Sequence, residues 1–238
     1  MKNALKVSEH FFSVQGEGKS VGVPAVFLRL TGCKLFCIFC DTTEVWKKGS
    51  DYSFEFLYEL FKSSGYLSAI VERGAHLVVT GGDPLIQQEG LYRFFDFFNS
   101  HSIFPGSDKF FVEVETEAVI QPEFPLVNLI NQWNVSPKLA NSGMDKFRRY
   151  KRDILQWHSF NDRSFFKFPV SCGTDLKEVM EIITICSIPR NRVWLMPICS
   201  TRQQFQEAAL PVIDLCKEYG FNFGNRLHLT VWNQATGV

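Results

Sequence analysis

Three cysteines within eight residues, Cys33, Cys37 and Cys40, are the residues of this chain whose type and spacing best predict a chemical site. Three thiolates on one short loop can bind three irons of a cubane iron–sulfur cluster, and the fourth iron then lacks a protein ligand. A cluster that only carries electrons normally has four cysteine ligands, so we expect a small molecule to complete the coordination. A zinc site with its fourth ligand elsewhere is an alternative, as are three unrelated core cysteines. Because the chain has no second Cys-x-x-Cys and no His-x3-His, the spacing favours the cluster.

The elements that must position this loop follow a repeating pattern. Six apolar, β-branched runs are typical of strands, and each is separated from the next by a segment that could hold a helix. The predicted strands cover residues 25–30, 76–80, 109–114, 132–135, 165–170 and 193–196, and a run at 226–232 is predicted to close the chain as a further strand. The clearest helical patterns cover residues 54–63, 90–98, 176–185 and 202–219. Six units are too few for an eightfold barrel, so we predict an α/β fold, a partial (β/α)6 open TIM-like barrel, in a single domain spanning residues 1–238.

Polar residues and glycines follow each of the predicted strands. They occupy residues 31–33, 80–84, 115–117, 136–138, 171–175 and 197–200. Any one of these stretches could be an ordinary turn, since turns favour such residues. In a parallel α/β fold, however, the carboxyl ends of the strands lie on one side, where ligands bind. The cysteine loop is therefore expected to share one site with the other strand ends.

Composition limits the classes of partner. The 238 residues include 25 Lys and Arg and 25 Asp and Glu, so no net field draws the protein to nucleic acid or to an anionic membrane. Residues 1–10 lack an apolar signal core, and no run of about 18 apolar residues occurs. We expect a soluble, cytoplasmic protein with a small-molecule partner. The remaining cysteines, Cys172, Cys186, Cys199 and Cys216, are predicted to be reduced core thiols.

The motifs resemble those of a known enzyme superfamily. With Gly81-Gly82-Asp83-Pro84 following the next strand after the cysteine loop, the chain resembles the radical S-adenosylmethionine superfamily, in which a cysteine triad holds a [4Fe-4S] cluster. There the glycine motif binds the amino end of the cosubstrate, and its usual acidic residue is Glu, where this chain has Asp83. Within that superfamily the chain is similar to the 7-carboxy-7-deazaguanine synthase family, from residue 12 to its end. The motifs that carry this resemblance are residues 12–18, 22–30, 40–42, 135–138 and 226–228.

The resemblance implies a reaction and a set of cofactors. The fold would be the partial barrel of the radical S-adenosylmethionine type. The reaction would convert 6-carboxy-5,6,7,8-tetrahydropterin into 7-carboxy-7-deazaguanine with loss of ammonia, in the biosynthesis of queuosine or another 7-deazaguanine. The cofactors would be the [4Fe-4S] cluster on Cys33, Cys37 and Cys40, S-adenosylmethionine, and Mg2+ near Thr42. The partners would be the pterin, a reductase such as flavodoxin as electron donor, and a second copy of the chain in a homodimer.

The resemblance also assigns residues to S-adenosylmethionine. These are Gly82, Ser136, Pro137, Lys138, Met196, Pro197, Ile198 and Cys199. The segment from Met196 to Cys199 departs from the acidic or glycine-containing versions of the family, so its contacts are expected to be mainly with backbone atoms. Glu115 and Thr116 are carried over too, although Glu117 and Ala118 after them replace the usual small or amide residue and glycine.

A second set of residues is assigned to the pterin. These are Val14, Gln15, Gly16, Glu17, Arg29, Thr80, His228 and Val238. Arg29 can bind the pterin carboxylate through two parallel hydrogen bonds, which lysine cannot do; otherwise it would be a snorkelling or salt-bridged edge residue. His228 is expected on the closing strand, where it could equally be a satisfied, half-buried histidine. The carboxylate of Val238 is expected to bind nitrogen donors of the pterin.

Two other classes of function remain open at this point. An enzyme that activates a glycyl-radical partner can carry the same Cys-x3-Cys-x2-Cys triad, but Arg29 and the Gln15-Gly16-Glu17-Gly18 loop suit a small anionic heterocycle better than a protein loop. A non-enzymatic zinc or iron–sulfur interaction module would not cleave S-adenosylmethionine at all.

Overall fold

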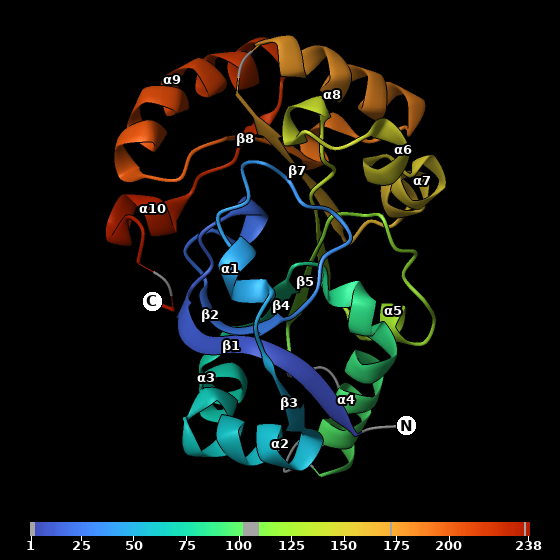
Figure 1. Cartoon of the computed structure of the whole chain (residues 1–238), viewed down its shortest axis with the longest axis vertical. Helices are drawn as coiled ribbons and strands as arrows, with labels where there is room; N and C mark the ends of the chain where they lie inside the picture. The colour runs from blue at the N-terminus through green and yellow to red at the C-terminus, as the bar shows by residue number, and fades with distance from the viewer. Residues whose placement is uncertain (1–2, 102–109, 172, 236) are drawn as a thin grey trace.

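The strands of the chain form one curved, mostly parallel sheet. The structure, a computed structural model, describes residues 3–101, 110–171, 173–235 and 237–238. Within these residues nine strands are ordered β3-β1-β2-β4-β5-β6-β7-β8-β9 (Figure 1). They are β1 (Ala4–Val14), β2 (Pro24–Leu30), β3 (Ser50–Ser53), β4 (His76–Gly81), β5 (Val112–Thr116), β6 (Gln132–Val135), β7 (Ser164–Val170), β8 (Val193–Pro197) and β9 (Asn222–Phe223). From β2 to β9 the pairs are parallel, and β1 is antiparallel to β2 and β3. The six predicted strands form the parallel part of this sheet, which confirms the partial open barrel.

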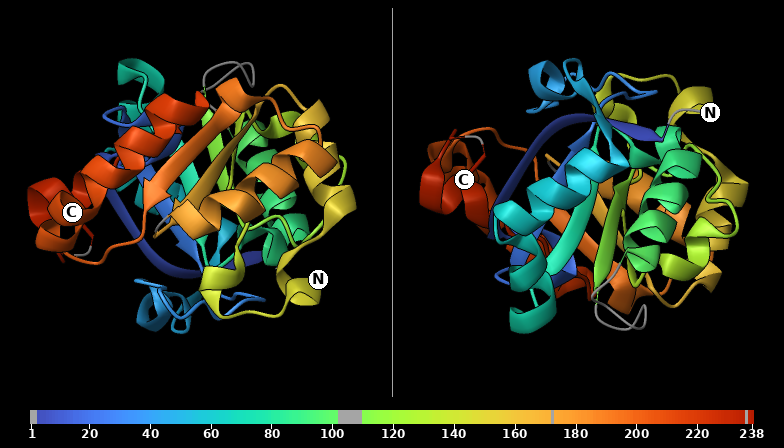
Figure 2. Two further views of the ribbon diagram at one scale, coloured as in Figure 1. Left: turned by 90° about the horizontal axis from the view of Figure 1, so that it is seen from above. Right: turned by 90° about the horizontal axis from the view of Figure 1, so that it is seen from below.

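The longer helices cover the outer face of the curved sheet (Figure 2). The helices of the described residues are α1 (Thr43–Trp46), α2 (Phe54–Ser63), α3 (Tyr66–Arg73), α4 (Gln88–Ser100), α5 (Leu126–Leu129), α6 (Lys146–Arg149), α7 (Arg152–Phe160), α8 (Gly173–Ile185), α9 (Arg202–Tyr219) and α10 (Leu227–Trp232), with short 3-10 turns at Gly18–Ser20, Pro84–Gln87, Ala140–Ser142 and Arg190–Arg192. Two of the four predicted helices, α2 and α9, have the predicted bounds. Ser53 caps α2 by accepting a hydrogen bond from the Phe56 N–H at 3.1 Å. Gly220 ends α9 with a φ of 72°, a conformation that glycine adopts without strain.

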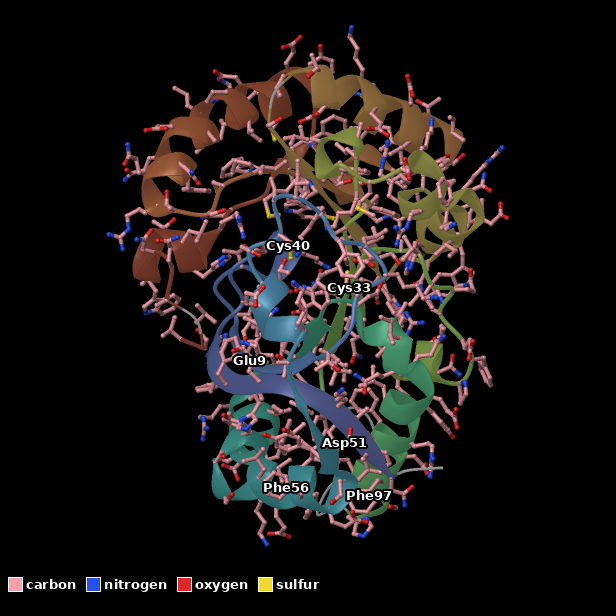
Figure 3. The ribbon with its side chains drawn as sticks, viewed as in Figure 1. Glu9, Cys33, Cys40, Asp51, Phe56 and Phe97 are labelled. Carbon is pink, nitrogen blue, oxygen red and sulfur yellow. The ribbon has the colours of Figure 1, made fainter. Side chains whose placement is uncertain are left out.

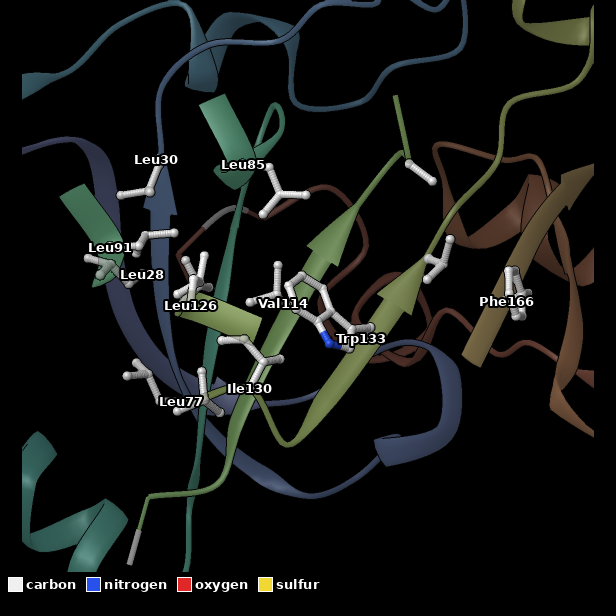
Figure 4. Close-up of a cluster of buried hydrophobic side chains, with 14 of the residues drawn as sticks. Leu28, Leu30, Leu77, Leu85, Leu91, Val114, Leu126, Ile130, Trp133 and Phe166 are labelled. Carbon is white, nitrogen blue, oxygen red and sulfur yellow. The ribbon is translucent and has the colours of Figure 1, made fainter. Parts of the chain in front are cut away.

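The core lies between the sheet and these helices. Alternate residues of β2 divide between its two faces: Leu28 and Leu30 are fully buried in the main core, whereas Phe27 and Arg29 face the other way. Figure 4 shows Leu28 and Leu30 in one cluster with Leu77 of β4, Val114 of β5 and, further along the sheet, Trp133 of β6. Each such side chain contributes about 1.5–3 kcal/mol when fully buried. The outer face of the sheet thus stabilises the fold, and its inner face is left for the site.

Strand β1 was not predicted, and a β-bulge explains why. The pairing of β1 with β2 shifts register between Val7 and Glu9. Before the shift Leu5 and Val7 belong to the main core, but after it Phe11 points to the opposite face and stacks on Phe27 with ring centroids 4.8 Å apart. Odd-numbered residues therefore lie on one face of the strand before the bulge and on the opposite face after it. No single period-2 pattern runs through the segment, so pattern reading fails there.

The predicted closing strand at 226–232 was wrong. Residues Leu227–Trp232 form α10, where the backbone N–H of Thr230 and that of Asn233 donate to carbonyl oxygens four residues earlier. A six-residue apolar run does not distinguish strand from helix by its pattern. Here the tertiary contacts decide, because Leu229 packs against Cys199 and Phe205 beneath the helix.

Smaller differences concern other predicted features. The third predicted strand begins later than expected, at Val112, and continues to Thr116; Lys109 lies outside the described residues. Cys186, Cys199 and Cys216 are buried free thiols, as predicted, and Cys172 lies outside the described residues. Among the helices that the structure describes, none is both long and apolar enough to cross a membrane.

Candidate active site at the carboxyl ends of the strands

One cavity of about 520 Å³ lies on the inner face of the sheet at the carboxyl ends of its strands. This volume is within the range of pockets that bind small molecules. Its wall includes the cysteine loop, the ends of β4, β5, β6 and β8, the loop after β1, and α10. In Figure 3 Cys33 and Cys40 lie on the loop that leaves β2, and Glu9 lies on β1. Segments from both ends of the chain thus meet at one site.

The cysteine loop presents all three thiols to this cavity. Cys33, Cys37 and Cys40 are half-buried, and each lines the wall. Leu35, which is buried, anchors the loop, and its N–H donates to Cys33 Sγ at 3.3 Å. The Cys40 N–H donates to the Cys37 carbonyl at 3.1 Å, which closes a tight turn. Burial raises the pKa of Cys33 and of Cys37; in Cys40 hydrogen bonds with Thr43 and its neighbours outweigh burial and lower the pKa.

The arrangement of the thiols fits a cluster better than a lone metal ion. Among the residues that the structure describes, no three or more His, Cys, Asp and Glu side chains are grouped so that they could hold one metal ion. A cluster of four irons separates its ligating sulfurs more widely than a single ion does. Three free thiols around one cavity therefore suit a [4Fe-4S] cluster.

The glycine pair after β4 packs directly against this loop. A Cβ atom on Gly82 would lie 2.0 Å from the Gly32 carbonyl oxygen and 2.6 Å from the Cys33 Cβ, so no larger residue fits. The Asp83 N–H donates to the same Gly32 carbonyl at 2.8 Å. Glycine is thus required here because the end of β4 and the cysteine loop approach each other closely.

Six of the eight residues predicted for S-adenosylmethionine line the cavity. They are Gly82, Ser136, Lys138, Met196, Pro197 and Ile198. Lys138 Nζ donates to Ser136 Oγ at 2.8 Å, so these two side chains form one polar wall. Pro137 and Cys199 do not line it; the Cys199 Sγ lies 3.5 Å from the Pro197 carbonyl oxygen, behind the wall.

The acidic residue of the glycine motif, Asp83, does not reach the cavity, but another carboxylate does. Asp83 is fully buried and accepts hydrogen bonds from the Leu85 N–H at 3.0 Å, the Thr116 hydroxyl at 3.0 Å and the Glu117 N–H at 3.3 Å. Glu117 lines the cavity, is 5% exposed, and accepts a hydrogen bond from the Cys33 thiol at 3.3 Å. Burial raises the pKa of Asp83 to about 6, and burial together with Asp83 raises that of Glu117 to about 7. Sequence reasoning assigned no role to Glu117, although its departure from the family pattern was the available signal.

All eight residues predicted for the pterin line the cavity, as does Thr42. They are Val14, Gln15, Gly16, Glu17, Arg29, Thr80, His228 and Val238. His228 reaches it from α10 instead of a strand, and a Cβ on Gly16 would lie 2.5 Å from its Nδ1. The Leu227 N–H also donates to the Gly16 carbonyl at 2.9 Å. The glycine therefore allows α10 to pack onto the loop after β1.

The guanidinium of Arg29 is paired at its Nε and open at its two terminal nitrogens. Its Nε donates to Glu9 Oε1 at 2.7 Å, in a pair whose side chains are 15% and 25% exposed. In the part of the chain that the structure describes, no hydrogen bond or ion pair engages its two terminal nitrogens. Glu9, which sequence reasoning missed because β1 was not predicted, thus orients the guanidinium and leaves a fork of donors facing the cavity.

A buried ion network holds the loop after β1. Glu17 pairs with Lys167 at 2.8 Å and with Arg226 at 3.1 Å, Lys167 also pairs with Glu115 at 3.3 Å, and Arg226 pairs with Asp41. Burial alone would raise the pKa of Glu17, but Lys167 and Arg226 hold it well below its usual range. Lys167 was missed, although a lysine within the apolar strand β7 is unusual and was the available signal.

Polar residues below the cavity orient the predicted substrate contacts. Gln15 Oε1 accepts from the Glu17 N–H at 3.1 Å, and Gln15 Nε2 lies 3.5 Å from carboxylate oxygens of both Glu113 and Glu115. The Thr80 hydroxyl donates to Glu115 at 2.8 Å. Acidic residues alternate with valine along β5, which places Glu113 and Glu115 on this inner face.

Comparison with known proteins agrees with the site. The family described as "4Fe-4S single cluster domain" matches residues 14–154, more than half of the chain. The chain is 36% identical over 236 residues to a 7-carboxy-7-deazaguanine synthase from Pyrobaculum aerophilum, covering 98% of this chain and 97% of that one. It is 38% identical over 243 residues to the protein of the same name from Escherichia coli K12, covering 93% and 96%. The crystal structure of QueE from Escherichia coli matches the fold with a TM-score of 0.68 at 24% identity, over 94% of this chain and 95% of that chain.

The similarity to the Pyrobaculum aerophilum protein spans nearly the whole of both chains. It therefore includes the segments that form the thiol-lined cavity. The chain therefore belongs to the 7-carboxy-7-deazaguanine synthase family, within the radical S-adenosylmethionine enzymes.

Proposed function

We propose that this protein converts 6-carboxy-5,6,7,8-tetrahydropterin into 7-carboxy-7-deazaguanine with loss of ammonia. The observation that carries the proposal is one cavity with three free thiols on one wall and the open donor fork of Arg29 on another. When bound at Cys33, Cys37 and Cys40, the cluster supplies the electron that cleaves S-adenosylmethionine to a 5′-deoxyadenosyl radical, and this radical removes a hydrogen atom from the substrate. The task of the chain is to place the two ligands against each other and to exclude water.

At the substrate end, Arg29 binds the carboxylate of the pterin. Gln15 and Glu17 offer amide and carboxylate groups to the nitrogen-rich edge of the ring, and His228 and Thr80 complete this wall. The buried network around Glu17 fixes the loop before the substrate arrives, which reduces the entropy lost on binding. Thr42 Oγ1, which faces the cavity 3.7 Å from Cys40 Sγ, is the ligand that we assign to a magnesium ion keeping most of its waters.

Replacing Arg29 by lysine should lower kcat/KM for the pterin about 10- to 100-fold. Lysine keeps the charge but loses the second parallel hydrogen bond, and a hydrogen bond to a charged group is worth about 1.5–3 kcal/mol. Steady-state kinetics with the carboxypterin varied would measure the change. The affinity for S-adenosylmethionine should stay the same, and an unchanged kcat/KM for the pterin would remove Arg29 from the carboxylate site.

At the other end, Gly82, Ser136, Pro137, Lys138 and the segment 196–199 hold S-adenosylmethionine. We assign the acidic contact with its ammonium group to Glu117, because the carboxylate of Asp83 is fully engaged behind the cavity wall. Once Cys33 is a thiolate ligand it has no proton to donate to Glu117, so the buried carboxylate loses that partner and can accept from a cation. Asp83 then acts indirectly, by holding the Glu117 backbone.

A Glu117→Gln variant should bind S-adenosylmethionine about 10- to 100-fold more weakly while keeping its cluster. Glutamine keeps the shape and a donor toward Cys33 but removes the charge that the ammonium needs. Equilibrium dialysis on the anaerobic, cluster-loaded protein would give the Kd, with Glu44→Gln on the exposed surface as a matched control. An analogue of S-adenosylmethionine in which a hydroxyl replaces the ammonium group should bind wild type and Glu117→Gln with equal affinity. Equal affinity of both proteins for S-adenosylmethionine itself would reject the assignment.

We also propose the setting in which the protein works. It would act in the cytoplasm as a homodimer, would receive electrons from a reductase such as flavodoxin, and would feed queuosine or another 7-deazaguanine. Residues 1–238 would form a single radical S-adenosylmethionine domain. In that domain the loop after β1 binds substrate and α10, in place of the predicted strand, closes the site.

One anaerobic experiment tests the reaction. The protein is reconstituted with iron and sulfide, reduced, and mixed with S-adenosylmethionine and the carboxypterin; we expect 5′-deoxyadenosine and 7-carboxy-7-deazaguanine. An enzyme that activates a glycyl-radical partner would leave the pterin unchanged, and a non-enzymatic module would leave S-adenosylmethionine intact. Either result would reject the proposed function.

A further inference from the structure

We propose that Lys167 is a positioning residue that makes the site selective for rings with adjacent N–H donors. It does so by holding the carboxylates of Glu17 and Glu115 together, as hydrogen-bond acceptors on one wall of the cavity. The rings selected are those with a cyclic guanidine edge, over rings with a carbonyl oxygen in place of the amino group. This inference rests on the proposed function, in which Glu17 faces the nitrogen-rich edge of the pterin, and it adds how that edge is distinguished.

Lys167 spans the inner face of the sheet to reach both acids. It lies on β7, Glu115 lies on β5, and β6 separates these two strands, while Glu17 belongs to the loop after β1. Its Nζ donates to Glu17 Oε2 at 2.8 Å and to Glu115 Oε1 at 3.3 Å. All three residues line the cavity. A single ammonium group thus brings two carboxylates from distant segments to one wall.

The ammonium group of Lys167 is buried and stays charged. The residue is 5% exposed, and burial alone would lower its pKa, but Glu115 and Glu17 raise the pKa above its ordinary value. Replacing a buried ion pair by apolar residues is often neutral for stability. The presence of a lysine within the apolar strand β7 therefore points to a task at the site that an apolar side chain could not perform.

The carboxylates around Lys167 outnumber the cations. Lys167 and Arg226 pair with three acids, which are Glu17, Glu115 and Asp41. The other titratable groups that face this network are Glu113 below it, Cys199, and His228, whose pKa is lowered by burial although Glu17 raises it. Without Lys167 only Arg226, which Asp41 shares, would remain beside the two carboxylates. One of them would then take up a proton.

The protonation of these carboxylates decides which edge of a ring they can bind. An ionised carboxylate accepts two parallel hydrogen bonds from adjacent N–H groups and repels a carbonyl oxygen, whereas a protonated one donates a hydrogen bond itself. A site built to bind an N–H group rejects an analogue that lacks it. By keeping both carboxylates ionised, Lys167 would set the preference of the site for the guanidine edge of a pterin.

Replacing Lys167 by methionine removes the charge and keeps the stem on which the substrate loop rests. A Cβ on Gly18 would lie 3.4 Å from Lys167 Cδ, so this stem packs against the loop. The probes are pterin-6-carboxylate and lumazine-6-carboxylate, unreactive rings that differ in an amino group or an oxygen at the carbon between two ring nitrogens. Fluorescence titration of the anaerobic, cluster-loaded protein with S-adenosylmethionine present would give both Kd values.

Wild type should bind the pterin compound at least about 10-fold more tightly than the lumazine compound. The Lys167→Met variant should bind the pterin compound about 10- to 100-fold more weakly near pH 6, should regain affinity as the pH rises to about 7.5, and should lose most of the preference. The affinity would rise with pH because the added proton leaves the carboxyl group. Equal losses for both compounds at every pH would reveal a purely structural role and would overturn the proposal, as would a wild type without the preference.

A second comparison does not depend on the folding of that variant. If Lys167 acts by balancing two acids, it becomes dispensable once Glu115 is neutral. The Lys167→Met, Glu115→Gln double variant should therefore bind the pterin compound within about 3-fold of Glu115→Gln alone. A further loss of about 10-fold would overturn the proposal. Failure of the double variant to fold where Glu115→Gln folds would overturn it too, because packing would then require the lysine itself.

The matched control is Lys217→Met, the same substitution on the exposed surface of α9, where Lys217 pairs with Asp214 at 3.1 Å. It should bind both compounds as wild type does. Turnover of the carboxypterin tests the proposed function separately. A wild type that forms no 7-carboxy-7-deazaguanine rejects that function, whereas a wild type that forms it while Lys167→Met keeps the wild-type preference rejects only the role of Lys167.

Discussion

Replacing any one of Cys33, Cys37 and Cys40 by alanine will abolish both cluster assembly and turnover. Each thiol lines the same cavity, and among the residues that the structure describes no group of three or more His, Cys, Asp and Glu side chains is placed to hold a metal ion instead. A site with two ligands left would bind iron weakly and would expose more than one iron to solvent. Iron and sulfide content after reconstitution, together with 5′-deoxyadenosine formation, would measure the loss.

The matched control is Cys216→Ala, which removes a buried free thiol from α9, far along the chain from the loop. It should keep its cluster and its activity, with only the modest destabilisation that a small core truncation causes. Full activity in any of the three loop variants would contradict the assignment of the cluster site.

The residues that sequence reasoning placed well are those whose signal is local. The cysteine spacing lies within one loop, and the alternation of β2 puts Arg29 on the face opposite Leu28, where the structure has it. The glycine pair at 81–82 is local too, because its cause is a close approach at the end of a single strand. Such features need only the periodicity of one element or the steric demand of one turn.

The features that sequence reasoning missed depend on contacts distant in sequence. Lys167 bonds to Glu17 across 150 residues, and Arg226 bonds to Glu17 across 209. The positions of these charged residues in the sequence do not predict which of them form pairs. In the sequence alone, each is a single charged residue with no identifiable partner. The bulge in β1 and the helix α10 were missed for a related reason, since the packing of neighbouring segments decides their conformation and not their own pattern.

The pairing of Glu17 has a consequence in acid. A carboxyl whose pKa is lowered by folding adds stability above its unfolded pKa of about 4.3, and this stability is lost as the pH falls from there towards the folded pKa. Lys167 and Arg226 lower the pKa of Glu17 in this way. The contribution of the network to folding should thus be complete at neutral pH.

The second large effect is expected at Arg226, whose replacement by methionine should lower the free energy of unfolding by about 3–5 kcal/mol at neutral pH. Arg226 is 8% exposed and joins three segments, because it bonds to Glu17 after β1, to Asp41 after the last cysteine and to the Cys199 carbonyl. Removing one partner of a buried pair leaves the other charges uncompensated. For a chain of this size that corresponds to a fall in Tm of about 6–20 °C. The KM for the pterin should rise as well, since the substrate loop and the cluster loop lose their common anchor.

The control for this variant is Arg163→Met, which removes hydrogen bonds to the Ile130 and Val127 carbonyls away from the cavity. It should lower Tm without changing the KM for the pterin. A double-mutant cycle with Glu17→Gln then isolates the pair: once Glu17 is neutral, the loss of Arg226 should be less damaging by more than about 1 kcal/mol. Strictly additive losses would contradict a network in which Arg226 acts through Glu17. Non-additive losses would show that the Glu17–Arg226 pair holds both the substrate loop and the cluster loop in place. This buried pair connects the beginning of the chain to its last helix.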